Sequence, residues 1–599
     1  MDCEEMIYSN DYDDYVINSL DLIIEGNENN CCTNPIIEGI AIQHCPQKEQ
    51  RLTNLESVPY SFIPKLYGLM DSTNMEVTGV KQAQEIGNLG LSGRGVIVAL
   101  IDTGIDYTNN LFIDENGNSR VGIIWDQTIS SGKLGDREKI QNVVIDNIEE
   151  SGDATAEEDL VMPWYGTVYS NSQINEALNS ENPYSVVNSR DDDGHGTFMA
   201  GIAAGGKSLG EDFTGIAYAS EIAVVKLKEA KPYLKEYFGV KREARAYQET
   251  DIIYAVDFIV KYAGKKKMPI SIYIGVGSSN GGHLGYTFLE RYLDSVLENI
   301  GVMISVPTGN EGNTRLHYAG NIPEDADYEM IDINIADGQT SLTMELWGDA
   351  PNTFAIGIDS PRGERIERIT PRFGTEELYG FPITRTSIYV VYQLVEVYSG
   401  DELIFIRINN PTPRIWRFYV YADDGRQRTF NIWMPLRQFL EQDTYFLKPE
   451  PENTVTNPGN SRLAITMTAY NHITGSLYAA AGRGYTARTV VKPSMTAPGV
   501  NITGPGLKNN FTTRTGTSVA AAHSAGMLAL FLEWNLANQE FGFFFAEQIA
   551  SFFFRSAERE ISYEYPNIFW GYGIMNIWDV FERFRIVDIP KVHKGVERI

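Results

Sequence analysis

Residues 513–526 read TRTGTSVAAAHSAG, and the apolar run MLALFL follows them at 527–532. Small residues crowd around the hydroxyl of Ser518, and the pattern predicts a buried helix that begins close to this serine. Backbone N–H groups at a helix start are unpaired and carry partial positive charge, so they favour an oxyanion beside Ser518. The stretch therefore offers a candidate nucleophile, although a small-residue helix packed tightly in a core would have the same sequence pattern.

Two other segments favour the catalytic interpretation. Residues 96–106, VIVALIDTGID, form an apolar run that ends on Asp102 and a glycine turn. This run predicts a buried parallel strand with Asp102 at its carboxyl end, where open α/β sheets place their sites. Residues 193–205, DGHGTFMAGIAAG, put His195 between two glycines at the start of a predicted helix. Singly, Asp102 could cap a turn and His195 could be a buried helix-start histidine, but with Ser518 they supply an acid, a base and a nucleophile.

These motifs resemble the signatures of the subtilisin-like serine proteases, peptidase family S8. The three matching segments are Asp102-Thr103-Gly104, His195-Gly196-Thr197 and Gly516-Thr517-Ser518, and their order along the chain is that of the family. A fourth segment, PTGNEGN at residues 307–313, is similar to the family's oxyanion-hole loop. The resemblance implies a serine endopeptidase with Asp102, His195 and Ser518 as its triad and Asn310 as an oxyanion donor. Asn310 could otherwise simply shape a glycine-rich loop.

The composition indicates a folded, acidic protein of several domains. At 599 residues the chain is too long for one simple core, so we expect two or three domains. Asp and Glu number 79 against 49 Lys and Arg, which gives a net charge of −30. A chain this acidic should be repelled by phosphate backbones and anionic membranes, which argues against a nucleic-acid partner. Its apolar runs are too short for a membrane span.

The sequence gives little indication of a metal or cofactor requirement. The first fifty residues contain all four cysteines, Cys3, Cys31, Cys32 and Cys45. Their clustering could indicate zinc, but the spacing fits no familiar pattern and only His44 lies nearby, so we name no metal site. Calcium stays open, because the polar stretch of residues 114–190 could hold ligands although scattered carboxylates are more often solvated. No cofactor is required by the chemistry that the motifs imply.

The N-terminal region of residues 1–68 forms a small acidic unit. We expect a helix near Asp11 to Leu22 and a strand around Ile36 to Ile42. The unit is too short to bury much core by itself, so it should pack on the remainder. The family resemblance implies that it is a prodomain, which assists folding, inhibits the enzyme and is cut from it by the new active site.

The segment SFIPKLYGLMD, residues 61–71, suits that cut. Pro64 favours an extended conformation before it, and an extended strand is what a protease cleft binds. Counting back from Asp102 by the family's usual spacing leads to Gly68 and Leu69, so the resemblance implies autoprocessing within Leu66 to Met70, around Tyr67, Gly68 and Leu69. A surface connector that is never cut is the alternative.

Residues 69–324 and 451–599 have the pattern of a catalytic domain in two parts. Apolar runs alternate with amphipathic helices, as in a parallel α/β sheet. Residues 271–278, SIYIGVGS, are similar to the strand that lines the specificity pocket in subtilases, so the resemblance assigns substrate binding to Gly275, Val276 and Gly277. The family often has serine where Gly275 stands, so the shape of the pocket does not follow from the resemblance.

Between residues 325 and 450 the sequence period changes to that of strands. We expect an inserted all-β domain of sandwich or jelly-roll type there, and Asp424-Gly425 is a hairpin turn signal. Seven stretches have strand patterns: Tyr328–Ile335, Ser341–Trp347, Phe354–Ile358, Ser387–Tyr398, Leu403–Ile408, Trp416–Tyr421 and Thr429–Trp433. The predicted fold class is therefore α/β, a subtilisin-like parallel sheet flanked by helices, with a small α+β prodomain and an inserted all-β domain.

The combination of a short prodomain, the PKLYG segment of residues 64–68 and a β-insert resembles the Csp germination proteases of clostridia and their paralogues in gut anaerobes. The resemblance implies a prodomain that stays bound after cleavage and a protein substrate, a zymogen cleaved in spore germination. Two alternatives are a prodomain-occluded pseudoprotease that acts as a scaffold and a general protein-degrading subtilase. No secretory signal is visible, so we expect a cytoplasmic or spore-associated bacterial protein.

Overall fold

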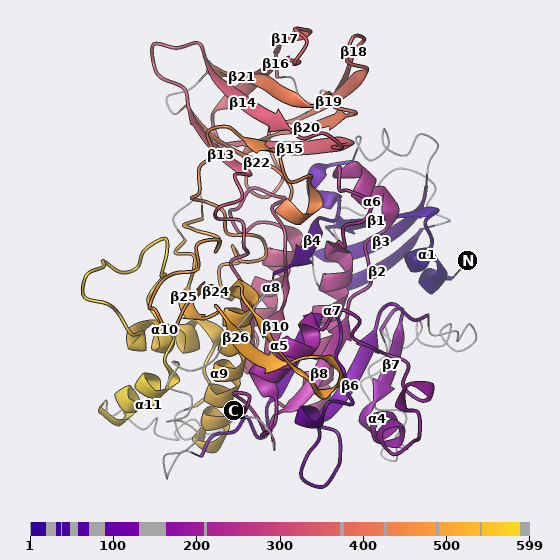
Figure 1. Ribbon diagram of the computed structural model, residues 1–599, viewed down its shortest axis with the longest axis vertical. Coiled ribbons are helices and arrows are strands. Elements are labelled where there is room, and N and C mark those ends of the chain that lie inside the picture. Colours follow the sequence, from indigo (N-terminus) through magenta and orange to yellow (C-terminus); the bar gives the residue numbers. More distant parts are fainter. Residues whose placement is uncertain are drawn as a thin grey trace, which may run out of the picture.

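The fold was analysed in a computed structural model of the chain (Figure 1). It describes residues 2–18, 31–37, 39–47, 58–70, 90–130, 163–208, 212–371, 376–424, 428–486, 490–539 and 542–586. A central sheet flanked by helices confirms the α/β class, with a small N-terminal unit on one side and an all-β domain at one end. Among the described helices, none has the length and apolar character needed to cross a bilayer.

The central sheet has eight strands. They run in the order β25 (Met495–Pro498), β24 (Ile465–Tyr470), β12 (Val302–Pro307), β10 (Ile270–Ile274), β5 (Ile97–Asp102), β8 (Glu221–Lys226), β6 (Val121–Asp126) and β7 (Thr167–Ser170). All neighbours pair in parallel except β6 and β7. Strand β5 is buried along its whole length, as expected for a parallel strand that is covered on both faces.

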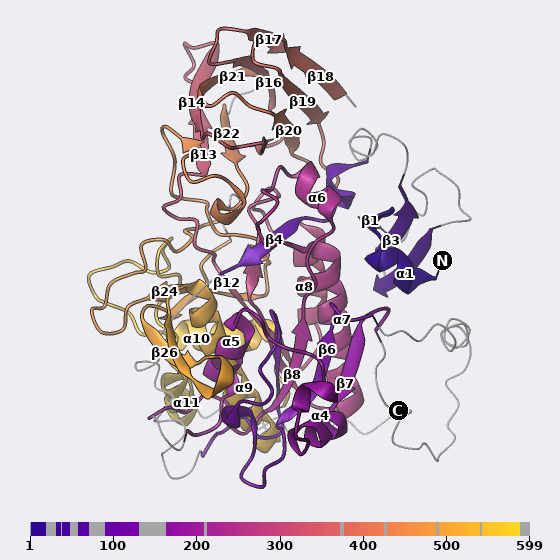
Figure 2. The same cartoon turned by 45° about the vertical axis from the view of Figure 1, so that its right-hand side comes forward.

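Helices cover both faces of this sheet. On one face, α9 (Thr517–Ala537) contacts five of the strands and packs against α5 (His195–Ala204). On the other, α7 (Glu249–Lys266) packs beside α8 (Phe288–Leu297) (Figure 2). Helix α9 is buried from Thr517 to Leu532, which explains why its sequence is apolar all round rather than amphipathic. The long core helix therefore begins at the candidate nucleophile.

The N-terminal unit is a three-stranded antiparallel sheet with one short helix, α1 (Cys3–Tyr8). Its strands are β1 (Tyr12–Ile17), β2 (Cys32–Ile37) and β3 (Ile40–Pro46), with β3 in the middle. The helix expected from Asp11 is wrong for the described residues, because this stretch pairs with β3 as a strand; the remainder of that expected helix, after residue 18, lies outside the described residues. The range Ile36 to Ile42, expected to be one strand, instead contains the end of β2 and the start of β3.

The cysteines form two disulfides within this unit. Cys3 bonds Cys32, and Cys31 bonds Cys45. The sequence pattern of these cysteines was considered above only for a zinc site, and no pairing was predicted. The bonds tie α1 to β2 and the start of β2 to β3, so the unit is cross-linked within itself and no disulfide joins it to the rest of the chain.

The inserted domain is a two-sheet β-sandwich around its own apolar core (Figure 1). One sheet has the order β13 (His317–Asn321), β22 (Thr429–Trp433), β15 (Ser341–Gly348), β20 (Glu402–Asn409), β19 (Thr386–Gln393) and β18 (Glu376–Phe381). The other has the order β17 (Arg365–Ile369), β16 (Thr353–Asp359), β21 (Arg414–Asp424), β14 (Tyr328–Ile335) and β23 (Tyr445–Phe446). All seven predicted strands are present.

The predicted boundary of the insert needs one correction. Strand β13 pairs with β22 from His317 onward, so the domain begins before residue 325. The pairing partner lies more than a hundred residues away along the chain, and the strand is too short to have a clear period of its own. The predicted turn Asp424-Gly425 lies partly outside the described residues, because they end at Asp424 and resume at residue 428.

Candidate active site

Asp102 and His195 meet at the carboxyl end of the central strand. Asp102 is the last residue of β5, and His195 is the first of α5. His195 Nδ1 lies 2.7 Å from Asp102 Oδ1 and 2.8 Å from Oδ2, and both side chains are fully buried. Thr103 N–H donates to Asp102 Oδ1 at 2.7 Å, which fixes the carboxylate. A buried carboxylate in this position favours the tautomer with the proton on Nδ1, leaving Nε2 to accept.

Ser518 lies at the N-terminal start of α9, as the sequence predicted. It is the second residue of the helix, after Gly516 and Thr517, and it is fully buried. Its Oγ has no hydrogen-bond partner among the described residues. A buried hydroxyl without a partner costs free energy, and in enzymes such unmet hydrogen bonding is often found at a catalytic group. The helix start also supplies the unpaired N–H groups that an oxyanion needs.

Asn310 lies beside the start of the same helix. Its Oδ1 accepts hydrogen bonds from the Thr517 N–H and from the Thr517 hydroxyl, both at 3.2 Å. These two bonds hold the oxygen of the amide away from the cleft side and leave the NH₂ group as the end that can donate to a reacting oxygen. The predicted oxyanion donor is therefore positioned by the residue next to Ser518.

The predicted substrate-binding strand is present, and part of the chain itself already pairs with it. Strand β11 (Val276–Gly277) pairs antiparallel with β4 (Leu66–Leu69), with Gly277 opposite Gly68 and Val276 opposite Leu69. On its other side β4 pairs with β9 (Tyr247–Gln248). An extended peptide that adds a strand between two cleft edges is a common mode of peptide recognition. The segment predicted for autoprocessing therefore occupies the cleft as a substrate would.

The residue at the centre of the site is Met70 rather than Gly68. Met70 N–H donates to the Gly275 carbonyl at 3.3 Å, which extends the antiparallel pairing by one residue. The Met70 carbonyl oxygen lies 3.4 Å from His195 Nε2. Tyr67, Gly68 and Leu69 lie in the cleft ahead of it, and Met70 is almost completely buried. The carbonyl that lies beside His195 thus belongs to the last residue of the range predicted for autoprocessing.

Gly275 has no room for a side chain, because Asp102 and Tyr273 fill the space beside it. A Cβ added at this position would collide with the Asp102 carboxylate and would lie 2.8 Å from the Tyr273 hydroxyl oxygen. The bulky Tyr273, buried on the preceding strand, takes the space that a side chain at 275 would need. This contact explains the departure from the serine that the family often has, and sequence could not have shown it.

Asp191 is a site residue that the sequence analysis missed. Its buried carboxylate accepts from Thr103 Oγ1 at 2.9 Å, from Gly194 N–H at 2.8 Å, and from Thr197 N–H and Oγ1 at 2.8 and 2.7 Å. It joins the turn after Asp102 to the first turn of the helix that carries His195. The sequence does show an aspartate four residues before His195. However, the run Asp191-Asp192-Asp193 is equally typical of a solvated surface segment.

Replacing Asp191 with asparagine should slow the reaction by about 10- to 100-fold, because small shifts of a reacting group have effects of this size. The asparagine oxygen can keep the hydrogen bonds from Thr103 and Gly194, but the NH₂ group that replaces the other oxygen cannot accept from Thr197. The rate of chain self-cleavage measures this effect. The matched control is Asp192→Asn, since the Asp192 side chain is 68% exposed and meets only Lys226 at 3.3 Å. Equal rates for the two variants would contradict a positioning role for Asp191.

No metal-binding cluster accompanies the site. Across the described ranges, no group of three or more His, Cys, Asp or Glu side chains is arranged to hold a metal ion. The polar stretch considered for calcium lies partly outside the described residues, at 131–162.

Comparisons with known proteins agree with this geometry. The model of the subtilase family, Peptidase S8, matches residues 93–254 and 443–573. The solved structure of the CspB protease of Clostridium perfringens is similar at 28% sequence identity and a TM-score of 0.71, over 84% of this chain and 97% of that one. No match to a curated protein was found.

Two further solved structures are more distant. MycP1 with its N-terminal propeptide removed has 13% identity and a TM-score of 0.36, over 86% of this chain and 97% of that one. The S41 psychrophilic protease has 14% identity and a TM-score of 0.40, over 84% of this chain and 99% of that one.

Proposed function

The chain belongs to the subtilase family of serine proteases, and from this premise we propose that it is an endopeptidase that first cleaves itself after Met70. The observation that supports this best is the strand Leu66–Leu69 bound between β9 and β11, with the Met70 carbonyl at His195. Ser518, His195 and Asp102 act as nucleophile, general base and orienting acid. Other protein substrates bind in the same extended form.

In the proposed reaction these groups take the roles of a serine-protease triad and its oxyanion donors. Ser518 Oγ attacks the Met70 carbonyl carbon while His195 Nε2 takes the hydroxyl proton. The Asp102 carboxylate accepts from Nδ1–H and stabilises the imidazolium. The oxyanion receives hydrogen bonds from the Asn310 NH₂ and the Ser518 N–H at the helix start. His195 then gives the proton to the leaving nitrogen of Asp71, and water later releases the acyl group from Ser518.

N-terminal sequencing of the purified protein tests this proposal. We expect the large fragment to begin at Asp71, and the bond after Met70 to be cut without any added protease. A protein that keeps all 599 residues would contradict self-processing. It would favour the alternative, in which the protein is a scaffold whose cleft stays filled by its own segment. That alternative is supported by the same burial of Leu66–Met70 in the cleft.

We further propose that the prodomain stays attached after the cut. Buried Asp14 on β1 lies 2.6 Å from His44 Nδ1 and accepts from Lys231 Nζ at 2.8 Å and from Gln248 Nε2 at 2.7 Å. His44 Nε2 in turn lies 3.0 Å from the Tyr254 hydroxyl. Burial alone raises the pKa of Asp14, but the charges of Lys231 and His44 outweigh it and hold this pKa well below its usual range. The carboxylate therefore stays charged and paired near neutral pH.

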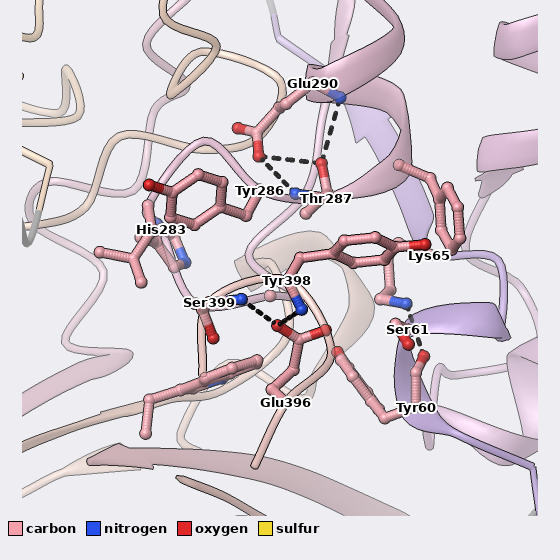
Figure 3. A pocket seen from close by; sticks show the side chains of 15 residues that line it. Tyr60, Ser61, Lys65, His283, Tyr286, Thr287, Glu290, Glu396, Tyr398 and Ser399 are labelled. Carbon is pink, nitrogen blue, oxygen red and sulfur yellow. Dashed lines mark hydrogen bonds between the residues drawn. The ribbon is translucent and has the colours of Figure 1, made fainter. Parts of the chain in front are cut away.

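The tail of the prodomain is fixed to all three parts of the molecule. Lys65 Nζ donates to the Tyr60 and Ile63 carbonyls at 2.8 and 2.6 Å, which closes the turn before β4 (Figure 3). The Tyr60 hydroxyl bonds Glu345 of the insert, and Glu345 also accepts from Asn280 of the catalytic domain at 2.7 Å. The small cavity at this junction encloses about 30 Å³. Such close packing at a three-way junction supports a tail that does not leave.

Replacing Asp14 with alanine should release the prodomain fragment after cleavage. The change leaves Lys231 buried without its carboxylate, and removing one partner of a buried pair typically costs about 3–5 kcal/mol. Gel filtration of the cleaved protein measures retention, with exposed Asp11→Ala in the same unit as the control. The wild type and the control should elute with both fragments, and the Asp14 variant should lose the small one. Wild-type fragments that separate by themselves would contradict retention.

The wider role that we propose is activation of a protein zymogen in spore germination. It is supported by the similarity to the CspB protease of Clostridium perfringens and by the features shared with the Csp group. A general degrading subtilase is the rival, and unfolded casein distinguishes them. Slow or absent casein hydrolysis by the self-cleaved protein supports a dedicated substrate, whereas rapid hydrolysis at many bonds supports general degradation.

A further inference from the structure

A short segment between β22 and β23 of the inserted domain lies against the strand β4. It consists of Leu436 and the 3-10 helix η5 (Arg437–Phe439). Gln438 Nε2 donates to the Leu69 carbonyl at 3.4 Å, although 369 residues separate the two in sequence. Leu436 is almost completely buried in a core shared by the prodomain, the catalytic domain and the insert. We call residues 436–439 the strap.

The strap is held at both ends, so it does not form a free flap. Arg437 N–H donates to Glu311 Oε2 at 3.2 Å, and Glu311 is the neighbour of Asn310. The Arg437 guanidinium donates to the Thr444 and Glu441 carbonyls at 2.7 and 2.5 Å. Lys241 N–H donates to the Phe439 carbonyl at 3.1 Å. The strap thus connects the oxyanion loop to the insert and keeps its place above the bound chain.

The strap covers Gly68, which is the third residue before the proposed cut when Met70 is counted as the first. A Cβ added at Gly68 would collide with the Gln438 amide group and would lie 3.0 Å from Leu436 Cδ1. Gly68 is buried even without a side chain. Gln438 is exposed and can turn aside, at the loss of its bond to Leu69, whereas Leu436 is packed and cannot. A methyl group is therefore tolerated better than a larger side chain.

We infer that the strap makes the protease selective for glycine at the third residue before the cleaved bond, with Gln438 and Leu436 as the specificity-determining residues. The substrate class is then a protein with an extended segment of the form Gly-Xaa-Xaa before the cut, as in Gly68-Leu69-Met70. Gln438 acts on the bound segment in two ways. It excludes a side chain at Gly68, and its amide binds the backbone carbonyl of the next residue, Leu69. This inference rests on the proposed self-cleavage after Met70.

The test is the rate of self-cleavage of full-length variants after cell-free synthesis, followed by intact mass. Gly68→Leu should slow cleavage at least about tenfold, as a mismatch in a substrate pocket does, and Gly68→Ala should slow it less. Adding Gln438→Ala to Gly68→Ala should restore most of the rate of Gln438→Ala alone. The control is Gly264→Ala on α7, where an added Cβ meets nothing within 4 Å, and it should match the wild type.

The outcomes separate this inference from the proposed function. Cleavage of Gly68→Leu at the wild-type rate would overturn glycine selectivity while leaving self-cleavage intact. A double variant that is folded by circular dichroism but stays as slow as Gly68→Ala would overturn the role of Gln438. An uncut wild type would instead overturn the proposed self-cleavage itself.

Discussion

Replacing Asp102 with asparagine should slow self-cleavage about 10,000-fold, the loss typical of a triad whose histidine is held in the wrong tautomer. Both oxygens of Asp102 lie within 2.8 Å of His195 Nδ1, so the NH₂ group of asparagine replaces one of them and faces the histidine. That NH₂ donates to Nδ1, which forces the proton onto Nε2. The base then has no lone pair for the Ser518 proton.

Time courses of intact mass measure this loss, because the slowed cleavage falls in a range of hours to days. Circular dichroism and gel filtration show whether the variant is folded, since the substitution keeps the size of the side chain. A folded Asp102→Asn protein that cleaves as fast as the wild type would contradict the role of the Asp102–His195 pair.

Replacing Asn310 with alanine should slow self-cleavage by about 100- to 1,000-fold, as the loss of one oxyanion donor does. The effect should fall on the chemical step rather than on binding, because the ground-state contacts of the cleft lie on β9, β11 and the strap. Retention of the prodomain fragment on gel filtration should therefore stay unchanged.

Asn313→Ala is the matched control for Asn310, because Asn313 belongs to the same loop and is exposed. The control should cleave like the wild type. If both variants lose the same factor, the loop contributes only by its shape and the donor role of Asn310 is wrong.

The parts of the site that the sequence predicted are those with strong local patterns. Asp102 ends a wholly apolar strand, His195 begins a helix between glycines, and Ser518 begins a long apolar helix. Each pattern specifies both the element and the end at which the residue lies. Parallel strands end at one edge of a sheet, and the helices that follow them begin there, so the sequence predicted that all three residues lie at that edge.

The parts that the sequence did not predict depend on contacts between distant residues. Gln438 meets Leu69 across 369 residues, and nothing in either local sequence marks that contact. The segment at Tyr12–Ile17 has a spacing of apolar residues that allows a helix, and its pairing with β3 decides for a strand. Strand β17, RIERI, carries three charged residues among its five, so its pattern was too polar to identify as a strand.

The position of the cut shows the same limit at the scale of one residue. The Pro64 signal indicated an extended segment, and the family's usual spacing from Asp102 restricted the predicted cut to Leu66–Met70. Only the pairing of Gly68 with Gly277 and the hydrogen bond from Met70 to Gly275 set the register. A register in a cleft depends on strands from two parts of the chain, and a local pattern contains only one of them.

The central claim is that Ser518 attacks the chain after Met70 in its own molecule. Its most direct measurement is intact mass over time for the wild type, for Ser518→Ala, and for a mixture of the two in which the variant is isotope-labelled. We expect the wild type to split into fragments 1–70 and 71–599 while the labelled variant stays whole, both alone and in the mixture. Cleavage of Ser518→Ala alone at this bond, or a wild type that remains whole, would contradict the claim.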